Sequence, residues 1–175
     1  LRRDGTVVAW GNPQAAAVPV GLSNVTALVG GGFHSLALLS NGTVVAWGQN
    51  TSGQTNVPAG LMEVTGIAAG RVHSLALIRD GTVVAWGDHT YGQTNVPTGL
   101  SNVIALAGGE YHSLALKRDG TVVAWGRNDA GQTNVPMDLT NVVALAAVGS
   151  HCLALKADGT VAAWGKDNSG QATVP

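Results

Sequence analysis

The sequence predicts an all-β fold of the β-propeller type, in which small antiparallel sheets stack face to face around a shared axis. Three observations favour this fold. A segment of the form His-(Ser/Cys)-Leu-Ala-Leu recurs at a spacing of 39 residues, beginning at His34, His73, His112 and His151. A Trp-Gly pair closes a second apolar segment at the same spacing, at Trp47, Trp86, Trp125 and Trp164. Both segments are apolar on both faces, so each sheet must be covered on both sides.

Composition limits the classes of function. The 175 residues are 45% hydrophobic, which is enough for a packed core, and only 11% are charged, with a net charge of −1. This balance provides no basic surface for nucleic acid or for an anionic membrane. No apolar run approaches the roughly 20 residues of a membrane-spanning helix. We therefore predict neither a nucleic-acid partner nor membrane insertion.

The repeats divide the chain into units. Residues 1–24 match the second half of a unit and predict a half blade. Complete units follow, and they predict blades at residues 25–63, 64–102, 103–141 and 142–175. We expect residues 1–175 to form a single repeat domain of about four and a half blades, which is a partial ring.

Each unit is expected to contain four short strands, here named A to D. In the third unit these are residues 103–107, 112–117, 121–126 and 132–136. Asp119-Gly120 lies between strands B and C and is typical of a tight hairpin turn. Pro136 cannot donate a hydrogen bond to a neighbouring strand, so strand D is predicted to be an edge strand or its end.

The tryptophan of each unit is predicted to be a wedge between neighbouring blades, because an indole buries a large apolar surface. A stacked open solenoid is the alternative to a propeller. The period and pattern exclude leucine-rich and ankyrin repeats, and the Gly-His and Trp-Asp signature of WD repeats is absent.

Three motifs carry a resemblance to a known family: Gly-x-x-His-Ser-Leu-Ala-Leu, Asp-Gly-Thr-Val, and Trp-Gly-x-Asn-x-x-Gly-Gln. Together they resemble the regulator of chromosome condensation repeat family and cover essentially the whole chain. The compact unit with Gly-Gln-Thr-Asn-Val-Pro is most similar to the bacterial subgroup that includes β-lactamase inhibitor protein II. The resemblance implies a propeller of seven blades.

Seven blades exceed what this sequence supplies. A ring usually closes by pairing strands from both termini, and the half blade at residues 1–24 needs strands A and B to complete it. Two identical chains would each bring an unpaired half blade, so simple dimerisation would not complete the ring. We expect the sequence to belong to a longer chain, with an oligomeric or open arrangement as the alternative.

The polar residues of the repeat predict structural roles. A zinc site needs about four ligands within ~2 Å of one ion, whereas residues at the same place on successive blades are held apart by the spacing of the blades. Each repeated histidine is therefore expected to begin strand B and to hydrogen-bond a neighbouring loop. Cys152 stands where other units have serine and is expected to be a small core residue. Asp4, Asp80, Asp119 and Asp158 precede glycine and are predicted to be turn residues. We therefore predict no catalytic residue, no metal site and no cofactor, and the chain is not expected to be an enzyme.

Variation between the units concentrates in two loops. In a meander, the A–B and C–D loops emerge on one face of the blades, and the B–C turns and D–A links emerge on the other. The B–C turns are nearly the same in every unit, whereas the A–B and C–D loops differ. Phe33, Tyr91 and Tyr111 all lie in these variable loops. Aromatic and arginine side chains on a rigid scaffold are common binding anchors.

We predict a non-enzymatic module that presents this loop face to a protein partner, with an inhibitor-like mode implied by the resemblance. The predicted contacts are Phe33, Arg71, His89, Tyr91 and Tyr111, with Asp88, Glu110 and Arg127 setting charge complementarity. Two alternatives stay open: a lectin-like glycan-binding propeller and a purely structural segment of a larger surface protein. The sequence leaves the identity of the partner and the oligomeric state open, and an extracellular or bacterial cell-surface location is the expectation.

Overall fold

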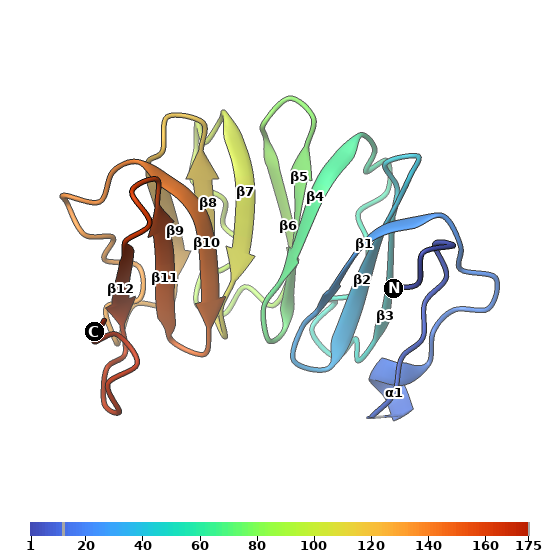
Figure 1. Cartoon of the computed structure of the whole chain (residues 1–175). Helices are drawn as coiled ribbons and strands as arrows, with labels where there is room; N and C mark the ends of the chain where they lie inside the picture. Colours follow the sequence, from blue (N-terminus) through green and yellow to red (C-terminus); the bar gives the residue numbers. More distant parts are fainter. Residues whose placement is uncertain (12, 175) are drawn as a thin grey trace.

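The four repeats form four three-stranded antiparallel sheets, which lie side by side in chain order in an open, unclosed arrangement (Figure 1). The computed structural model describes residues 1–11 and 13–174. The strands of the four sheets, or blades, are β1 (Val25–Gly30), β2 (His34–Leu39) and β3 (Val44–Gly48); β4 (Val64–Ala69), β5 (His73–Ile78) and β6 (Val83–Gly87); β7 (Val103–Gly108), β8 (His112–Lys117) and β9 (Val122–Gly126); and β10 (Val142–Val148), β11 (His151–Lys156) and β12 (Val161–Gly165). The fold class predicted from the sequence, a partial propeller, is confirmed.

An Asp-Gly turn joins the second and third strands of the second, third and fourth blades, and Asn41-Gly42 takes its place in the first. In the second blade, Gly81 has a φ of 84°, a conformation that glycine adopts without steric cost. Asp80 Oδ1 accepts hydrogen bonds from the Thr82 hydroxyl at 2.7 Å and from the Thr82 amide at 2.9 Å. The hydrogen bond from the Thr82 side chain, more than any other contact, lowers the pKa of the Asp80 carboxyl. The turn role predicted for these aspartates is therefore confirmed.

The predicted fourth strand of each unit is wrong. In the third unit, residues 132–136 form consecutive tight turns instead of an extended strand. The Asn134 amide donates to the Gly131 carbonyl at 3.0 Å, and the Thr133 amide donates to Asn128 Oδ1 at 3.0 Å. These local hydrogen bonds occupy the backbone groups that a fourth strand would have used to pair with β9.

This turn segment serves the next blade rather than its own. The main-chain oxygen of Gln54 accepts a hydrogen bond from Trp86 Nε1 at 2.9 Å and another from the Ser74 hydroxyl at 2.8 Å. The Gln54 side chain is itself fully buried. The segment therefore fastens one blade to the strands of the following blade.

The blades meet through two complementary faces, which we call the leading face, toward the following blade, and the receiving face, toward the preceding one. Between the second and third blades, Leu75 and Leu77 of the leading face pack against Val103, Ala115 and Trp125 of the receiving face. All five side chains are buried. Equivalent residues form the other two junctions: Leu36, Leu38, Val64, Ala76 and Trp86; and Leu114, Leu116, Val142, Ala154 and Trp164. The sequence was thus correct that both faces are covered and that tryptophan lies between blades.

Residues 1–24 occupy the position of a preceding half blade. Val7, Val18 and Leu22 pack against the receiving face of the first blade, at Ala37 and Trp47. The described part of this segment contains no strand, because the chain that would be its third strand has no second strand beside it. It contains instead the four-residue helix α1 (Pro13–Ala16), which was not predicted.

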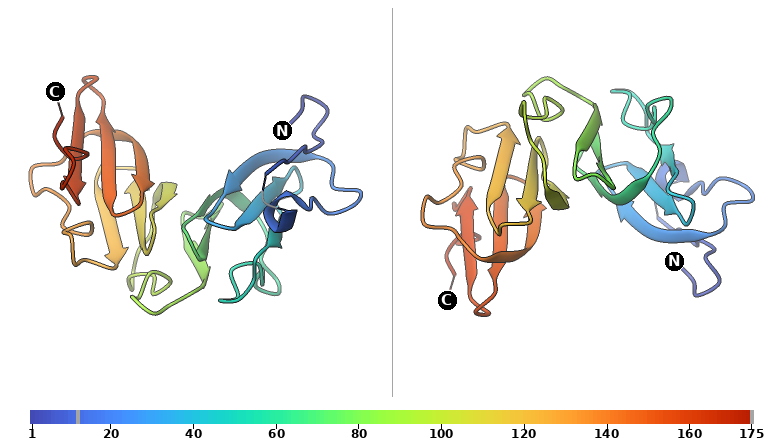
Figure 2. Two further views of the ribbon diagram at one scale, coloured as in Figure 1. Left: turned by 90° about the horizontal axis from the view of Figure 1, so that it is seen from below. Right: turned by 90° about the horizontal axis from the view of Figure 1, so that it is seen from above.

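The two ends of the row differ from its interior. Trp10, the counterpart of the buried tryptophans, is 86% exposed, and Leu155 of the fourth blade is 40% exposed, whereas its counterpart Leu116 is fully buried. Figure 2 shows the termini at opposite ends of the open row. Among the described residues, the structure has no helix of the length and apolarity that a membrane crossing requires.

Candidate functional site

Three of the repeated histidines, His34, His73 and His112, each form a side-chain hydrogen bond with the following blade. His73 Nε2 lies 3.0 Å from the Ser113 hydroxyl, which in turn donates to the main-chain oxygen of Gln93 at 2.9 Å. A hydroxyl has one proton, so Ser113 must accept the hydrogen bond from His73 Nε2–H. His34 and Ser74 repeat this arrangement at 3.0 Å. The histidine partner is thus a strand residue of the next blade, whereas the sequence predicted a loop.

These histidines are uncharged at neutral pH. Burial lowers the pKa of His34, His73 and His112 to about 4. The part of the chain that the structure describes has no group of three or more histidine, cysteine or acidic side chains that could hold a metal ion. The histidines therefore act as neutral hydrogen-bond donors between blades.

Cys152 takes the place of serine in the third link. Its sulfur lies 3.1 Å from His112 Nε2 and 3.4 Å from the main-chain oxygen of Gln132. The thiol is fully buried, and burial raises its pKa to about 12. The thiolate is the reactive form of cysteine, so this group is not a nucleophile at neutral pH. The prediction that Cys152 is a small core residue is confirmed.

A glycine precedes His34, His73 and His112 by three residues, and the imidazole ring of each histidine leaves no space for a side chain at that glycine. A Cβ added at Gly70 would lie 2.1 Å from His73 Cε1 and 2.5 Å from the main-chain oxygen of Gly109. We expect Gly70→Ala to lower the free energy of unfolding by about 1–3 kcal/mol, as measured by urea denaturation. Gly30→Ala is the matched control, because a Cβ at Gly30 meets nothing within 4 Å. Equal stability of the two variants would contradict the close packing of the His73 imidazole against Gly70.

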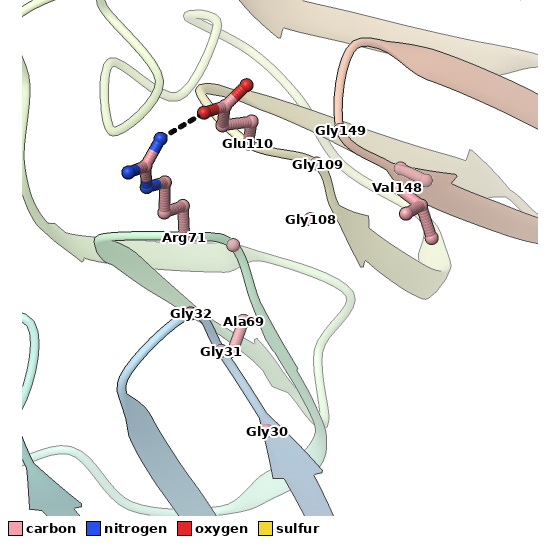
Figure 3. Close-up of a pocket in the computed structure, with 12 residues that line it drawn as sticks. Gly30, Gly31, Gly32, Ala69, Arg71, Gly108, Gly109, Glu110, Val148 and Gly149 are labelled. Atoms are coloured by element: carbon pink, nitrogen blue, oxygen red, sulfur yellow. Dashed lines mark hydrogen bonds and ion pairs between the residues drawn. The ribbon is translucent and has the colours of Figure 1, made fainter. Parts of the chain in front are cut away.

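The C-terminal ends of β1, β4, β7 and β10, the first strands of the four blades, converge on a small hollow. It has a volume of about 220 Å³ and is lined mainly by glycines, with Arg71 and Glu110 at its rim (Figure 3). Two of its backbone donors are engaged within the protein: the Arg71 amide donates to the Glu110 carbonyl, and the Glu110 amide donates to the Gly149 carbonyl. The chemical interest of this region therefore lies at its rim, with the Arg71–Glu110 ion pair.

The variable loops lie together on one face, as predicted. The loop after the third strand of each blade begins with an amide that donates to the loop before the second strand. Asp88 donates to the Val72 carbonyl at 3.0 Å, and Arg127 donates to the Tyr111 carbonyl at 2.9 Å. At the opposite end of the blades, the Val103 amide donates to the carbonyl of the turn residue Gly81. We call the first of these surfaces the loop face.

Five of the predicted contact residues form one group on the loop face, which we call the loop cluster: Arg71, Tyr91, Glu110, Tyr111 and Arg127. The rings of Tyr91 and Tyr111 are tilted by 56°, with centroids 5.2 Å apart. The Arg127 guanidinium lies 5.0 Å from the Tyr91 centroid and 5.7 Å from the Tyr111 centroid. Arg71 lies 5.9 Å from the Tyr111 centroid and pairs with Glu110. Both arginines thus flank the aromatic pair at distances typical of cation–π contacts.

The other three predicted residues have different surroundings. Phe33 lies on the first blade and is 44% exposed. His89 is exposed next to Asp88 in the same loop. The Asp88 carboxylate is used inside its own loop, where Oδ1 accepts from the Thr90 amide at 2.7 Å and from Gln93 Nε2 at 3.1 Å.

The sequence missed Asp129. Its carboxylate pairs with Arg127 and accepts from Gln132 Nε2 at 3.3 Å. The short Arg-Asn-Asp spacing in this loop was the available signal. The ion pairs of the cluster are solvent-accessible and contribute little to stability, so their effect is to orient the arginines.

A family model described as the regulator of chromosome condensation (RCC1) repeat matches residues 25–54, 64–93, 103–132 and 142–171. A search of curated proteins found no match.

Solved structures with the same fold span several organisms. The ectodomain of the receptor kinase CR4 from Physcomitrella patens is 29% identical, with a TM-score of 0.73 over 89% of this chain and 44% of that one. Yeast RCC1 (Prp20), solved with Kap60 bound, is 25% identical, with a TM-score of 0.71 over 90% of this chain and 45% of that one. Human WBSCR16, at 24% identity and a TM-score of 0.69, covers 82% of this chain and 49% of its own, and it shows the fold alone. This chain spans about half the length of these structures.

Proposed function

This chain belongs to the regulator of chromosome condensation repeat family, and we propose that it is a non-enzymatic module that binds a protein through its loop face. The loop cluster carries the proposal. It gathers both tyrosines of the chain and two of its arginines on one side of a rigid row of blades. Tyrosine and arginine are enriched among the residues that dominate protein–protein binding energy.

The geometry of the cluster also supports binding. Tyr91 is 46% exposed, so a partner can cover much of its ring. Arg127 lies against both tyrosines and pairs with Asp129, which restricts its rotamers before any partner arrives. Side chains that are ordered in advance lose less conformational entropy on binding. The matched yeast structure, in which an RCC1 protein is bound to Kap60, supports the use of this fold for protein binding.

The distribution of the cluster favours a protein over a glycan. A lectin-like propeller would repeat one polar and aromatic pocket in every blade. Here the positions equivalent to Tyr91 are Ser52, Ala130 and Ser169, and those equivalent to Tyr111 are Phe33, Val72 and Ser150, so only the junction of the second and third blades has an aromatic residue at both positions. One asymmetric patch fits a single large partner better than a series of identical sugars.

The test is binding by single alanine variants. Extracts of the source cells are passed over the immobilised chain, and proteins retained by the wild type are purified and titrated. We expect Tyr91→Ala and Tyr111→Ala each to weaken binding by about 10- to 100-fold, which corresponds to roughly 1.4–2.8 kcal/mol. Isothermal titration calorimetry measures the dissociation constants.

Arg118→Ala is the matched control, because Arg118 is an exposed arginine on the B–C turn at the opposite end of the blades. It should leave affinity unchanged. Wild-type affinity in both tyrosine variants would contradict the loop face as the binding surface, and specific hits on a glycan array would favour the lectin alternative.

Two finer statements belong to the same proposal. We propose an inhibitor-like mode, in which the loop face covers the rim of another protein's active site, on the ground of the sequence resemblance to the compact bacterial subgroup alone. A partner enzyme should then lose activity in proportion to the fraction bound. An extracellular or cell-surface location would fit this mode, and fractionation of the source cells tests it.

A further inference from the structure

Adjacent junctions of the loop face are filled differently. Between the second and third blades, the space is occupied by Tyr91 and Tyr111, whose centroids are 5.2 Å apart. One repeat of 39 residues further along, the same positions hold the small residues Ala130 and Ser150. A hollow of about 500 Å³ lies there, lined by Arg127, Ala130, Ser150 and Lys166 among others. We call it the blade 3–4 hollow.

Arg127 belongs to both places. Its guanidinium lies over the rings of Tyr91 and Tyr111, and its side chain also lines the blade 3–4 hollow. A guanidinium is planar and stacks well on aromatic rings. An aromatic side chain placed in the hollow would therefore extend an existing series of aromatic and guanidinium groups.

The charges of the hollow argue against a charged ligand. Its three carboxylates already have partners in the protein: Glu110 pairs with Arg71, and Asp129 pairs with Arg127. Asp167 accepts from the Ala172 amide at 2.7 Å and from the Thr173 hydroxyl at 2.9 Å. Arg127 and Lys166 line the hollow, and Arg71, which lies outside the lining, pairs with Glu110, so the three acids are matched by three cations and neither a cation nor an anion finds a net opposite charge.

We propose that the blade 3–4 hollow is a subsite for a tyrosine side chain of the protein partner. Its ring would stack on Arg127, in the space that Tyr111 fills at the preceding junction, and its hydroxyl would reach the polar rim at Lys166 and Ser150. This inference rests on the proposed protein-binding function, and it specifies the chemistry that the partner must present.

The direct test uses a free tyrosine analogue. The ¹⁵N-labelled chain is titrated with N-acetyl-L-tyrosinamide and followed by ¹H–¹⁵N correlation spectra. We expect saturable shifts of the Ala130 and Ser150 amides. N-acetyl-L-leucinamide, N-acetyl-L-lysinamide and the corresponding glutamate derivative should bind at least 10-fold more weakly. Equal or tighter binding of any of these three probes would overturn the proposal.

Two variants locate the site. Ser150→Tyr recreates in the hollow the side chain found at Tyr111 and should abolish the shifts of the neighbouring amides. Val72→Tyr places the same side chain at the same repeat position of the second blade and should leave them unchanged. Arg127→Lys keeps the charge but removes the planar group, and it should weaken tyrosinamide at least 5-fold even if Ser150→Tyr does not fold. Unchanged tyrosinamide binding in Arg127→Lys or in a folded Ser150→Tyr would overturn the assignment.

The same variants separate this inference from the proposed function. If a partner binds in a manner that depends on Tyr91 and Tyr111 but is unaffected by Ser150→Tyr, the subsite is wrong and the loop face stands. If tyrosinamide binds the hollow but no partner depends on Tyr91 or Tyr111, the preference of the hollow for tyrosine stands and the loop cluster is wrong as the protein-binding site.

Discussion

Replacing Trp86 with alanine should lower the free energy of unfolding by about 3–5 kcal/mol. The indole is only 7% exposed and packs against Leu36 and Leu38 of the preceding blade. Its Nε1 also donates to the main-chain oxygen of Gln54 at 2.9 Å, and that oxygen would lose one partner in the variant. Urea denaturation followed by circular dichroism measures the change.

The chain provides its own control for this substitution. Trp10 occupies the same repeat position but is 86% exposed, so Trp10→Ala should change stability by less than about 0.5 kcal/mol. Similar losses in the two variants would show that the effect belongs to the residue type and not to the junction.

Acidification from pH 7 to pH 4 should destabilise the fold by several kcal/mol. Burial lowers the pKa of His34, His73 and His112 in the folded state to about 4, from the ordinary histidine value of 6.5. Below pH 6.5 the unfolded chain takes up protons that the folded chain does not, so stability falls as the pH drops from 6.5 to 4. Each histidine accounts for at most about 3 kcal/mol across this range. Three together approach the whole stability of a typical domain.

The measurement is the urea midpoint at pH 7, 6, 5 and 4.5. The turn aspartates Asp119 and Asp158, with a pKa of about 2, add their own loss only at lower pH, so the two contributions separate. His73→Gln should reduce the slope of stability against pH by about a third, because it removes one of the three buried histidines. A flat profile between pH 7 and pH 4.5 would contradict burial of neutral histidines.

The parts of the fold that depend on local sequence were predictable. Strands, Asp-Gly turns and the tryptophan at each junction repeat with one period, so that an assignment made in one repeat is supported by the same pattern in the others. The fourth strand was wrong because the hydrogen bonds of Gln54 and its counterparts run to the following blade, which a local pattern cannot reveal. The strand expected before Trp10 does not form, since strand formation needs a neighbour as well as a suitable sequence.

The candidate site was predictable in composition but not in arrangement. Loop position and residue type identified Tyr91, Tyr111 and Arg127. That Tyr91 lies against Tyr111 follows only once the second and third blades are known to be neighbours. Asp88 was predicted to be a surface charge that faces a partner. In the structure its carboxylate accepts hydrogen bonds from Thr90 and Gln93 and so orders its own loop.

The complementarity of leading and receiving faces bears on how such a chain can change in length. Because every junction joins the same two kinds of surface, an in-frame duplication of 39 codons inserts a module whose two new boundaries match those already present. The number of repeats can therefore change by whole units without any change in the residues that pack between blades. Point mutations can meanwhile change the loops without removing any of the buried apolar side chains that join the blades.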